Sequence, residues 1–442
     1  MELYLKMNYH LKVIFAMKMR PRLNNAEKPL AMELRKVIIR SLSVTLLSLL
    51  IFTSCNKEEN KPDYPHYVSN ELAITFTQTY INSMLTTVSS TIPDIADLKP
   101  LVKSDVKVYK VVYKTSANGN EIKASGIVCF PTQTGEYPVI SFQNGTNTVN
   151  ALAPSQNVLS NLYQMIEVVA SMGYVVVVAD YPGFGESVFV THPYLVKEPT
   201  VQSLIDMLYA TKELAAAEFP AIILKNEYYL LGYSQGGWAT LALHKALELD
   251  YQNDFNLAGS ACGAGPYNIS LLFEGMVNVP TYPMPVYLGY ILNAYKAYNQ
   301  FTNPVTDIFK EPYASKLATL YTGMLGFDAI NNQLTTSIPS LINADFLSGY
   351  TTLAKYSSVR DALRNNSVTA WNTKKPLLLI HGGSDTQVNP VSTENMYSSM
   401  LQAGTSQALI TKVIVPNVDH SDGIIPCMLK GIFFLQSIND SN

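Results

Sequence analysis

The stretch that decides the fold runs from residue 228 to residue 238 and reads Tyr228-Tyr-Leu-Leu-Gly-Tyr-Ser234-Gln-Gly-Gly-Trp238. Its first four residues are apolar, which is typical of a buried strand, and a helical pattern continues over Gly237–Leu249. Ser234 stands between the two within a Gly-x-Ser-x-Gly pattern. At a strand-to-helix turn this pattern is typical of a nucleophile elbow, in which a serine projects alone and the glycines let strand and helix pack closely. We therefore predict that Ser234 is a catalytic nucleophile.

Strands and helices alternate along most of the chain around this stretch. The expected strands are Val106–Lys114 and Glu121–Phe130, joined in a hairpin by Asn118-Gly119, and then Val139–Phe142, Tyr174–Ala179, Tyr228–Leu231, Leu257–Ala264, Leu377–Ile380 and Leu409–Val415. The expected helices are Glu71–Leu85, Pro154–Met172, Val201–Glu218, Gly237–Leu249, Val391–Ala403 and Asp422–Ile438. Continuous apolar strands separated by helices indicate a mostly parallel central sheet with helices on both faces.

The alternation breaks over residues 266–368, which hold several Pro and many Tyr, Phe, Leu and Met without a strand–helix rhythm. We expect a mainly helical cap insertion over these residues. The α/β core would then comprise residues 66–265 and 369–442.

Composition excludes several classes of protein. The 442 residues are 48% hydrophobic and 15% charged, with a formal net charge of −3. This balance argues against disorder, which needs low hydrophobicity, and against a nucleic-acid partner, which needs a basic excess. Four cysteines exclude a disulfide scaffold and show no Cys-x-x-Cys zinc spacing. After Cys55, three cysteines remain, so at most one disulfide is expected, with Cys262–Cys427 as the candidate pair.

The N-terminal residues 1–55 read as a targeting segment. Basic residues precede an uncharged run over Ser41–Phe52, which is too short to span a membrane and fits a secretory signal. Met32 alone would start a signal of normal length. Phe52-Thr-Ser-Cys55 resembles a loose lipobox, so Cys55 is the predicted lipid attachment site, followed by a tether over residues 56–65. We expect a lipid anchor in the cell envelope, at the outer membrane of a Gram-negative bacterium, with a secreted or periplasmic protein as the alternative.

A serine nucleophile needs a base and an orienting acid, which in this strand–helix arrangement follow in the order Ser, acid, His. Asp385 comes just beyond the strand Leu377–Ile380, and His420 follows the next strand. The other five histidines lie too early or too far along the chain from Ser234, namely His10, His66, His192, His244 and His381. Asp419 and Asp422 are rivals for the acid, but an acid adjacent to its histidine seldom reaches the far ring nitrogen. We predict the triad Ser234, Asp385 and His420.

An oxyanion hole requires two backbone N–H donors. One should come from Gln235, the residue after the nucleophile. The other should come from the loop Gln143-Asn-Gly-Thr146, where we favour Thr146 and place Gly145 second.

These segments resemble the α/β-hydrolase superfamily and, within it, the secretory lipases and related bacterial lipoprotein esterases. The matching segments are Gln143-Asn-Gly-Thr146 with Ala151-Leu-Ala-Pro-Ser155, Asp180-Tyr-Pro-Gly-Phe-Gly-Glu-Ser187 with His192-Pro-Tyr-Leu195, and His381-Gly-Gly-Ser-Asp385. The likeness spans about residues 105–440. Asn144 departs from it, because the family usually has His before Gly-Thr, although a backbone donor does not require that side chain. In this resemblance Asp180 and His192 are structural loop residues.

The resemblance implies a serine hydrolase that cleaves carboxylic esters through an acyl-serine intermediate, as a carboxylesterase or lipase, with no metal or cofactor. The expected substrate is a small-molecule or lipid ester. Two alternatives remain open: a serine peptidase or acyltransferase using the same triad, and a non-catalytic surface lipoprotein that binds a ligand. The sequence does not set the oligomeric state.

Overall fold

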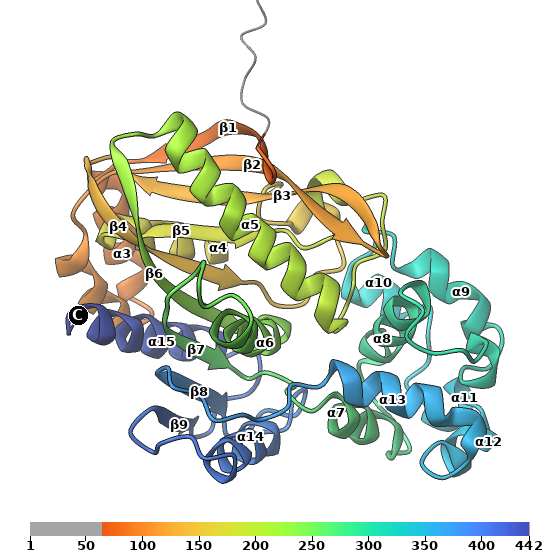
Figure 1. Cartoon of the computed structure of the whole chain (residues 1–442). Coiled ribbons are helices and arrows are strands. Elements are labelled where there is room, and N and C mark those ends of the chain that lie inside the picture. The colour runs from red at the N-terminus through yellow and green to blue at the C-terminus, as the bar shows by residue number, and fades with distance from the viewer. Residues whose placement is uncertain (1–63, 442) are drawn as a thin grey trace, which may run out of the picture. The chain divides into compact units, whose positions relative to one another are not determined.

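The computed structural model describes residues 64–441 and places a nine-stranded sheet at their centre (Figure 1). The strands are β1 (Tyr67–Phe76), β2 (Val106–Ala117), β3 (Asn120–Pro131), β4 (Gly135–Gln143), β5 (Val175–Ala179), β6 (Ile222–Tyr233), β7 (Leu257–Gly263), β8 (Leu377–Gly382) and β9 (Ile410–Val415). They are arranged in the order β1-β2-β3-β5-β4-β6-β7-β8-β9. From β5 to β9 every pairing is parallel, whereas β1, β2 and β3 are antiparallel to their neighbours. The prediction of a mostly parallel sheet is confirmed.

The predicted hairpin forms between β2 and β3. Asn118 and Gly119 occupy its turn with φ values of 51° and 74°, as a two-residue hairpin turn requires. Their sequence is the usual one for this turn because glycine and asparagine tolerate positive φ best.

The helix predicted over Glu71–Leu85 is wrong in its first half and confirmed in its second half. Residues Tyr67–Phe76 form β1, which pairs antiparallel with β2, and helix α3 (Gln78–Ser89) begins only after it. The open edge of β2 offers backbone hydrogen bonds to this stretch, which a local pattern does not reveal. Thr77 then starts the helix, because its side chain accepts a hydrogen bond from the backbone N–H of Tyr80 at 3.2 Å.

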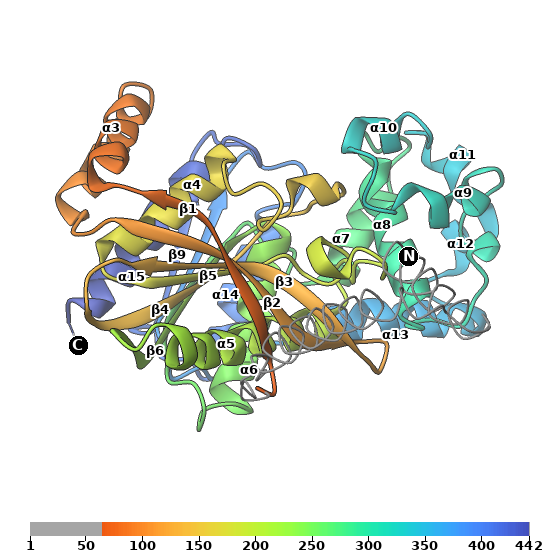
Figure 2. The same cartoon turned by 90° about the horizontal axis from the view of Figure 1, so that it is seen from above.

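Helices cover both faces of the sheet (Figure 2). The core helices are α3 (Gln78–Ser89), α4 (Asn161–Glu167), α5 (Lys197–Glu218), α6 (Gln235–Leu249), α14 (Val391–Gln402) and α15 (Ile424–Asn439). Strand β5 shows how both faces are buried: Val175 and Val177 pack in the core beneath α5 and α6, and Val176 and Val178 pack in the core beneath α3 and α15. A fully apolar strand is the expected consequence of this double burial.

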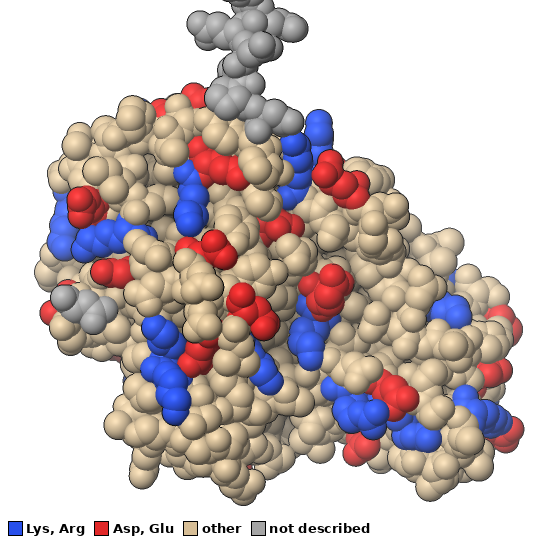
Figure 3. All heavy atoms as spheres, viewed as in Figure 1, with Lys and Arg blue, Asp and Glu red and all other residues tan. Residues whose placement is uncertain are grey.

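Between β7 and β8 the chain leaves the sheet and forms seven helices in a fully described stretch. They are α7 (Ile269–Val277), α8 (Pro285–Ala297), α9 (Tyr313–Leu320), α10 (Phe327–Asn331), α11 (Ile338–Leu341), α12 (Ala344–Gly349) and α13 (Ser357–Asn366). Figures 1 and 2 both show them grouped together at one end of the sheet. Their buried side chains belong to the same hydrophobic cluster as those of α5 and α6. On the face shown in Figure 3, acidic and basic side chains are interspersed.

Candidate active site

Ser234 occupies the sharp turn between β6 and α6. Its φ of 60° and ψ of −123° lie in a region that residues with a side chain rarely adopt. The surrounding glycines are required by close packing: a Cβ at Gly232 would meet the Thr240 side chain, and one at Gly236 would meet the Gln143 carbonyl oxygen. The strand–serine–helix geometry expected from the sequence is therefore present.

The structure brings the three predicted triad side chains together. His420 Nε2 lies 2.8 Å from Ser234 Oγ, and His420 Nδ1 lies 2.6 Å from Asp385 Oδ2. Because a carboxylate can only accept, Nδ1 carries the proton and donates it to Asp385. Nε2 is then free to accept the serine hydroxyl proton.

Asp385 is 4% exposed and surrounded by donors. Its Oδ1 accepts from the backbone N–H groups of Gln387 and Val388, each at 2.9 Å. Its Oδ2 lies 3.2 Å from His381 Nε2, in addition to its bond with His420. Burial alone would raise the pKa of Asp385, but the nearby His381 Nε2–H, the hydrogen bond and positive charge of His420, and the Val388 N–H outweigh it and hold the pKa at about 2.

Two supporting residues were not assigned a role from the sequence. His381, set aside there, donates from Nε2 to the Val388 carbonyl at 2.8 Å and so helps to fix the turn that carries Asp385. Tyr233 donates its hydroxyl to the carbonyl oxygen of His420 at 2.7 Å. Tyr233 sits in the deciding stretch immediately before the serine, which is the one signal that could have indicated it.

The rival residues lie elsewhere. Asp419 and Asp422 are exposed, and Asp419 accepts from the Asp422 backbone N–H instead of from the histidine ring. His244 is buried against Ser260 and Thr373. Within residues 64–441, His420 is the one histidine that bonds Ser234; His10 lies outside the described residues.

The predicted oxyanion donors surround the serine. Gln235 is the first residue of α6, where backbone N–H groups have no partner within the helix and the helix dipole favours negative charge. Thr146 and Gln235 line the same cavity as Ser234 and His420. A Cβ on Gly145 would lie 3.9 Å from Ser234 Cβ, so this loop passes directly beside the nucleophile. The oxyanion role of Gln235, Thr146 and Gly145 stays a prediction.

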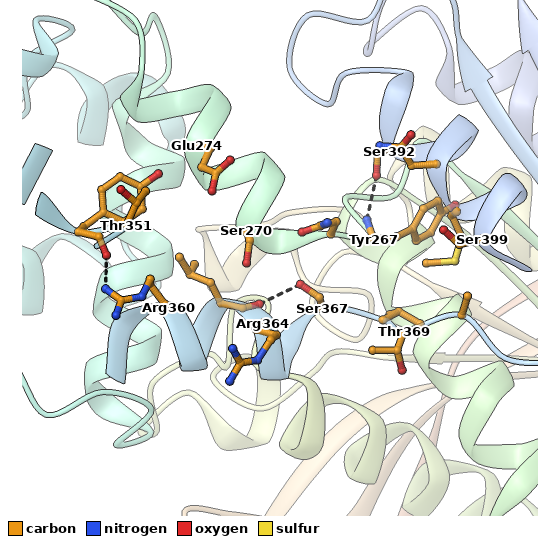
Figure 4. Close-up of a pocket in the computed structure, with 17 residues that line it drawn as sticks. Tyr267, Ser270, Glu274, Thr351, Arg360, Arg364, Ser367, Thr369, Ser392 and Ser399 are labelled. Carbon is orange, nitrogen blue, oxygen red and sulfur yellow. Dashed lines mark hydrogen bonds between the residues drawn. The ribbon is translucent and has the colours of Figure 1, made fainter. Parts of the chain in front are cut away.

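Three adjoining cavities extend from the serine. The first holds about 20 Å³. It shares Leu272, Met276 and Gln387 with a second cavity of about 150 Å³. The second shares Asn268 and Ser392 with a third of about 540 Å³ between α7, α13 and α14. Figure 4 shows that polar side chains from these helices line the third cavity, among them Ser270, Glu274, Arg360, Arg364 and Ser399.

Asp180 and His192 are buried away from the serine hydroxyl. Asp180 accepts from the hydroxyls of Ser125 and Ser155, each at 2.5 Å. His192 contacts the carbonyl oxygen of Pro182 and the side chain of Gln235. Both bind loop segments, as the resemblance implied.

The predicted Cys262–Cys427 disulfide is wrong. Cys129, Cys262 and Cys427 are buried and free. Cys262 packs in the core beneath α6, whereas Cys427 packs in the core on the other face of the sheet, so the sheet separates the two thiols.

Several expectations concern the N-terminal segment. The targeting segment 1–55, including Cys55, and most of the tether lie outside the described residues. None of the helices in the described part of the chain has the length and apolar composition needed to cross a bilayer. Within residues 64–441, His, Cys, Asp and Glu side chains form no group of three that could hold a metal ion.

Several solved structures share this fold. A putative hydrolase from Legionella pneumophila is 25% identical, with a TM-score of 0.74 over 84% of this chain and 98% of that chain. The rice cell wall degrading esterase LipA from Xanthomonas oryzae is 23% identical, with a TM-score of 0.71 over 86% and 98%. Candida antarctica lipase A in its closed state is 14% identical, with a TM-score of 0.61 over 87% and 86%. These likenesses confirm the predicted α/β-hydrolase fold.

The fold and these comparisons define the class: the protein is an ester hydrolase of the α/β-hydrolase superfamily. Within it, the model of the secretory lipase family matches residues 155–423, and the chain belongs to that family. The predicted resemblance is therefore confirmed. No curated protein matches the chain.

Proposed function

We propose that the protein hydrolyses carboxylic esters through an acyl-serine intermediate. Ser234 Oγ attacks the ester carbonyl carbon while His420 Nε2 takes the hydroxyl proton, and His420 then delivers this proton to the departing alcohol oxygen. Water attacks the acyl-serine by the same route in reverse, releasing the acid and restoring Ser234. Asp385 orients His420, and the amides of Gln235 and Thr146, with Gly145 as the second choice in that loop, hold the negative oxygen of each tetrahedral intermediate.

The observation that carries this proposal is the directed hydrogen-bond chain Asp385–His420–Ser234. Its two distances of 2.6 and 2.8 Å are within normal hydrogen-bond range. The pKa of about 2 keeps Asp385 negative through the neutral range, where it stabilises the protonated His420 that forms during the attack. These two features supply the base and the orienting acid that a serine hydroxyl needs to act as a nucleophile.

The test is hydrolysis of p-nitrophenyl esters from acetate to palmitate by wild type, Ser234→Ala and Ser421→Ala. Ser421 is an exposed serine next to His420, so its replacement is a matched control. We expect Ser234→Ala to lose at least about 10³-fold in kcat and Ser421→Ala to remain active. Unchanged turnover by Ser234→Ala would exclude the acyl-serine mechanism.

We infer that the group beside the ester carbonyl is short rather than a long alkyl chain. The cavity at Ser234 holds about 20 Å³, and the second cavity, with which it shares Leu272, Met276 and Gln387, holds about 150 Å³. The same ester series tests this, because a short-chain optimum supports it and a palmitate optimum contradicts it.

The family and the similar esterases favour ester hydrolysis over the two alternatives. A peptidase on this triad would cleave p-nitroanilides, and an acyltransferase would pass the acyl group to an added alcohol instead of to water. A non-catalytic binding protein would be inactive on every substrate, in wild type as in Ser234→Ala.

We also propose that residues 266–368 form a cap over the serine and that Cys55 carries a lipid anchor in the cell envelope, at the outer membrane. Membership of a secretory family supports an exported protein. Fractionation tests the anchor: wild type should sediment with membranes and Cys55→Ala should be released. Equal distribution of the two would favour the secreted or periplasmic alternative.

A further inference from the structure

The side chain of one oxyanion residue, Gln235, is held by a buried histidine. His192 Nδ1 lies 3.0 Å from the Pro182 carbonyl oxygen, and because a carbonyl only accepts, Nδ1 carries the proton. His192 Nε2 therefore accepts, and the Gln235 side-chain amide donates to it at 2.9 Å. Burial lowers the pKa of His192 to about 4, so the ring is neutral at neutral pH and this pattern is retained.

The other oxyanion residue, Thr146, is held by the same segment. Two residues after His192, the hydroxyl of Tyr194 lies 3.3 Å from Thr146 Oγ1. The Tyr194 backbone N–H donates to the His192 carbonyl at 2.8 Å, which makes the segment a tight turn. One short segment therefore contacts the side chains of both residues predicted to hold the oxyanion.

Helix α8 of the insertion contacts both the segment that contains His192 and Tyr194 and the loop that contains Thr146. The Tyr290 ring stacks on the Tyr194 ring, with centroids 4.3 Å apart and planes at 10°. The Tyr290 hydroxyl donates to the carbonyl oxygen of Asn147, the residue after Thr146, at 2.9 Å. Two further tyrosine hydroxyls donate to the segment Thr191–Leu195, which contains His192. Tyr295 donates to the Leu195 carbonyl at 3.1 Å, and Tyr298 donates to the Thr191 carbonyl at 2.9 Å.

The loop after Thr146 is attached to the insertion at a second point. The Asn150 backbone N–H donates to the Gly323 carbonyl at 2.7 Å, and Val149 pairs with Met324 in an isolated β-bridge. The oxyanion loop is thus bound by α8 on one side and by the segment around Gly323 on the other.

From these contacts we propose that the insertion sets the geometry of the oxyanion hole, with Tyr290 and Tyr194 as positioning residues that act through Asn147 and Thr146. This rests on the proposed function, because it assumes that the Thr146 and Gln235 amides bind the oxyanion. The insertion then contributes to the chemical step itself, in addition to any part in admitting substrate. Oxyanion donors stabilise the transition state only when their N–H groups are aimed correctly, so a small displacement lowers kcat.

The test removes single hydroxyls. Tyr290→Phe keeps the stacked ring and loses the bond to Asn147, and Tyr194→Phe keeps its ring and loses the bond to Thr146. Tyr321→Phe is the matched control: Tyr321 stacks on Tyr290 at 4.7 Å, but its hydroxyl donates to Val286 inside α8 at 2.7 Å and not to the oxyanion loop. For each variant, kcat, KM, the unfolding midpoint and the Ki of a boronic acid inhibitor that forms a tetrahedral adduct on Ser234 would be measured.

We expect Tyr290→Phe and Tyr194→Phe each to lower kcat about 10-fold with KM unchanged, and to raise the boronic acid Ki by a similar factor. Tyr321→Phe and Tyr290→Phe each lose one hydrogen bond. Tyr321→Phe should nevertheless change kcat less than about twofold. A purely structural role would lower the unfolding midpoints of Tyr290→Phe and Tyr321→Phe alike and leave the ratio of their kcat values near one.

Two results would overturn the inference: equal kcat losses in Tyr290→Phe and the control, or an effect confined to KM. If Tyr290→Phe does not fold, Tyr194→Phe against the same control decides. Ser234→Ala separates the two levels. If Ser234→Ala is inactive and the three Tyr→Phe variants have equal kcat values, only the positioning role is refuted. If Ser234→Ala is active, both the proposed function and the positioning role are refuted.

Discussion

Two carboxylates at similar depth behave in opposite ways. Asp385, in the turn after β8, is 4% exposed, and Glu167, at the end of α4, is fully buried. Asp385 receives hydrogen bonds from the His420 ring and from two backbone N–H groups, and its pKa is about 2. Neither oxygen of Glu167 has a hydrogen-bond partner among the described residues, and burial raises its pKa to about 8.

The difference shows that donors, and not depth, decide whether a buried carboxylate is charged. Asp385 lies where strand ends and loops converge, so N–H groups are available to it. Glu167 lies within a hydrophobic cluster formed by apolar side chains of α3, α15 and the sheet. The first site maintains a charge that the proposed reaction uses, and the second tolerates a carboxyl only in its protonated form.

The largest effect should come from Asp385→Asn. An asparagine keeps the shape but turns an N–H toward His420 Nδ1, which favours the wrong tautomer and leaves Nε2 unable to accept the serine proton. We expect kcat to fall by roughly 10⁴-fold. Steady-state hydrolysis of p-nitrophenyl acetate would measure this loss.

Asp419→Asn is the control for this substitution, since Asp419 is an exposed acid beside the histidine in sequence. It should retain activity within about twofold, as surface substitutions usually do. If Asp419→Asn were the inactive variant and Asp385→Asn the active one, the assignment of the acid would be wrong.

The sequence singled out one of these two carboxylates and not the other. Asp385 could be located because the order Ser, acid, His and the positions of strand ends constrain where an acid can stand. Glu167 carried no such signal: it lies inside the predicted helix Pro154–Met172, of which only Asn161–Glu167 is α-helical in the structure. Which face of a short helix is buried depends on packing against distant strands, which a local pattern does not contain.

The same distinction applies to the rest of the fold. The parallel sheet and the elbow follow from local periodicity and turn chemistry. The edge strand β1 and the tyrosine contacts of α8 depend on partners far away in the chain, such as Val106–Ala117 for β1 and Asn147 for Tyr290. The false Cys262–Cys427 pair has the same origin, since the count of cysteines does not reveal on which face of the sheet each one lies.

A second prediction concerns stability at alkaline pH. Because the pKa of Glu167 is raised from 4.5 to about 8 on folding, the folded state retains a proton that the unfolded state releases. The stabilisation is complete below pH 4.5 and is lost as the pH rises from 4.5 through 8, by up to about 5 kcal/mol. Glu167→Gln cannot ionise, so in urea unfolding it should be more stable than wild type at pH 9 and similar to it at pH 5.

Glu136→Gln is the matched control, since Glu136 is an exposed glutamate on β4. It should leave the pH dependence of unfolding as in wild type. A Glu167→Gln curve that runs parallel to wild type from pH 5 to 9 would mean that donors reach Glu167 in solution.

The smallest expected effect is a loss of folding stability at acid pH, which is caused by protonation of Asp385. Its pKa falls from 3.8 to about 2 on folding, so the charged carboxylate stabilises the folded state above pH 3.8, and this stability is lost as the pH falls through 2. The shift corresponds to about 2 kcal/mol. The stability of wild type relative to Asp385→Asn should therefore decrease by that amount between pH 5 and pH 2, the opposite direction to Glu167. Parallel unfolding curves over this range would show that the donors around Asp385 serve its orientation alone and do not hold its charge.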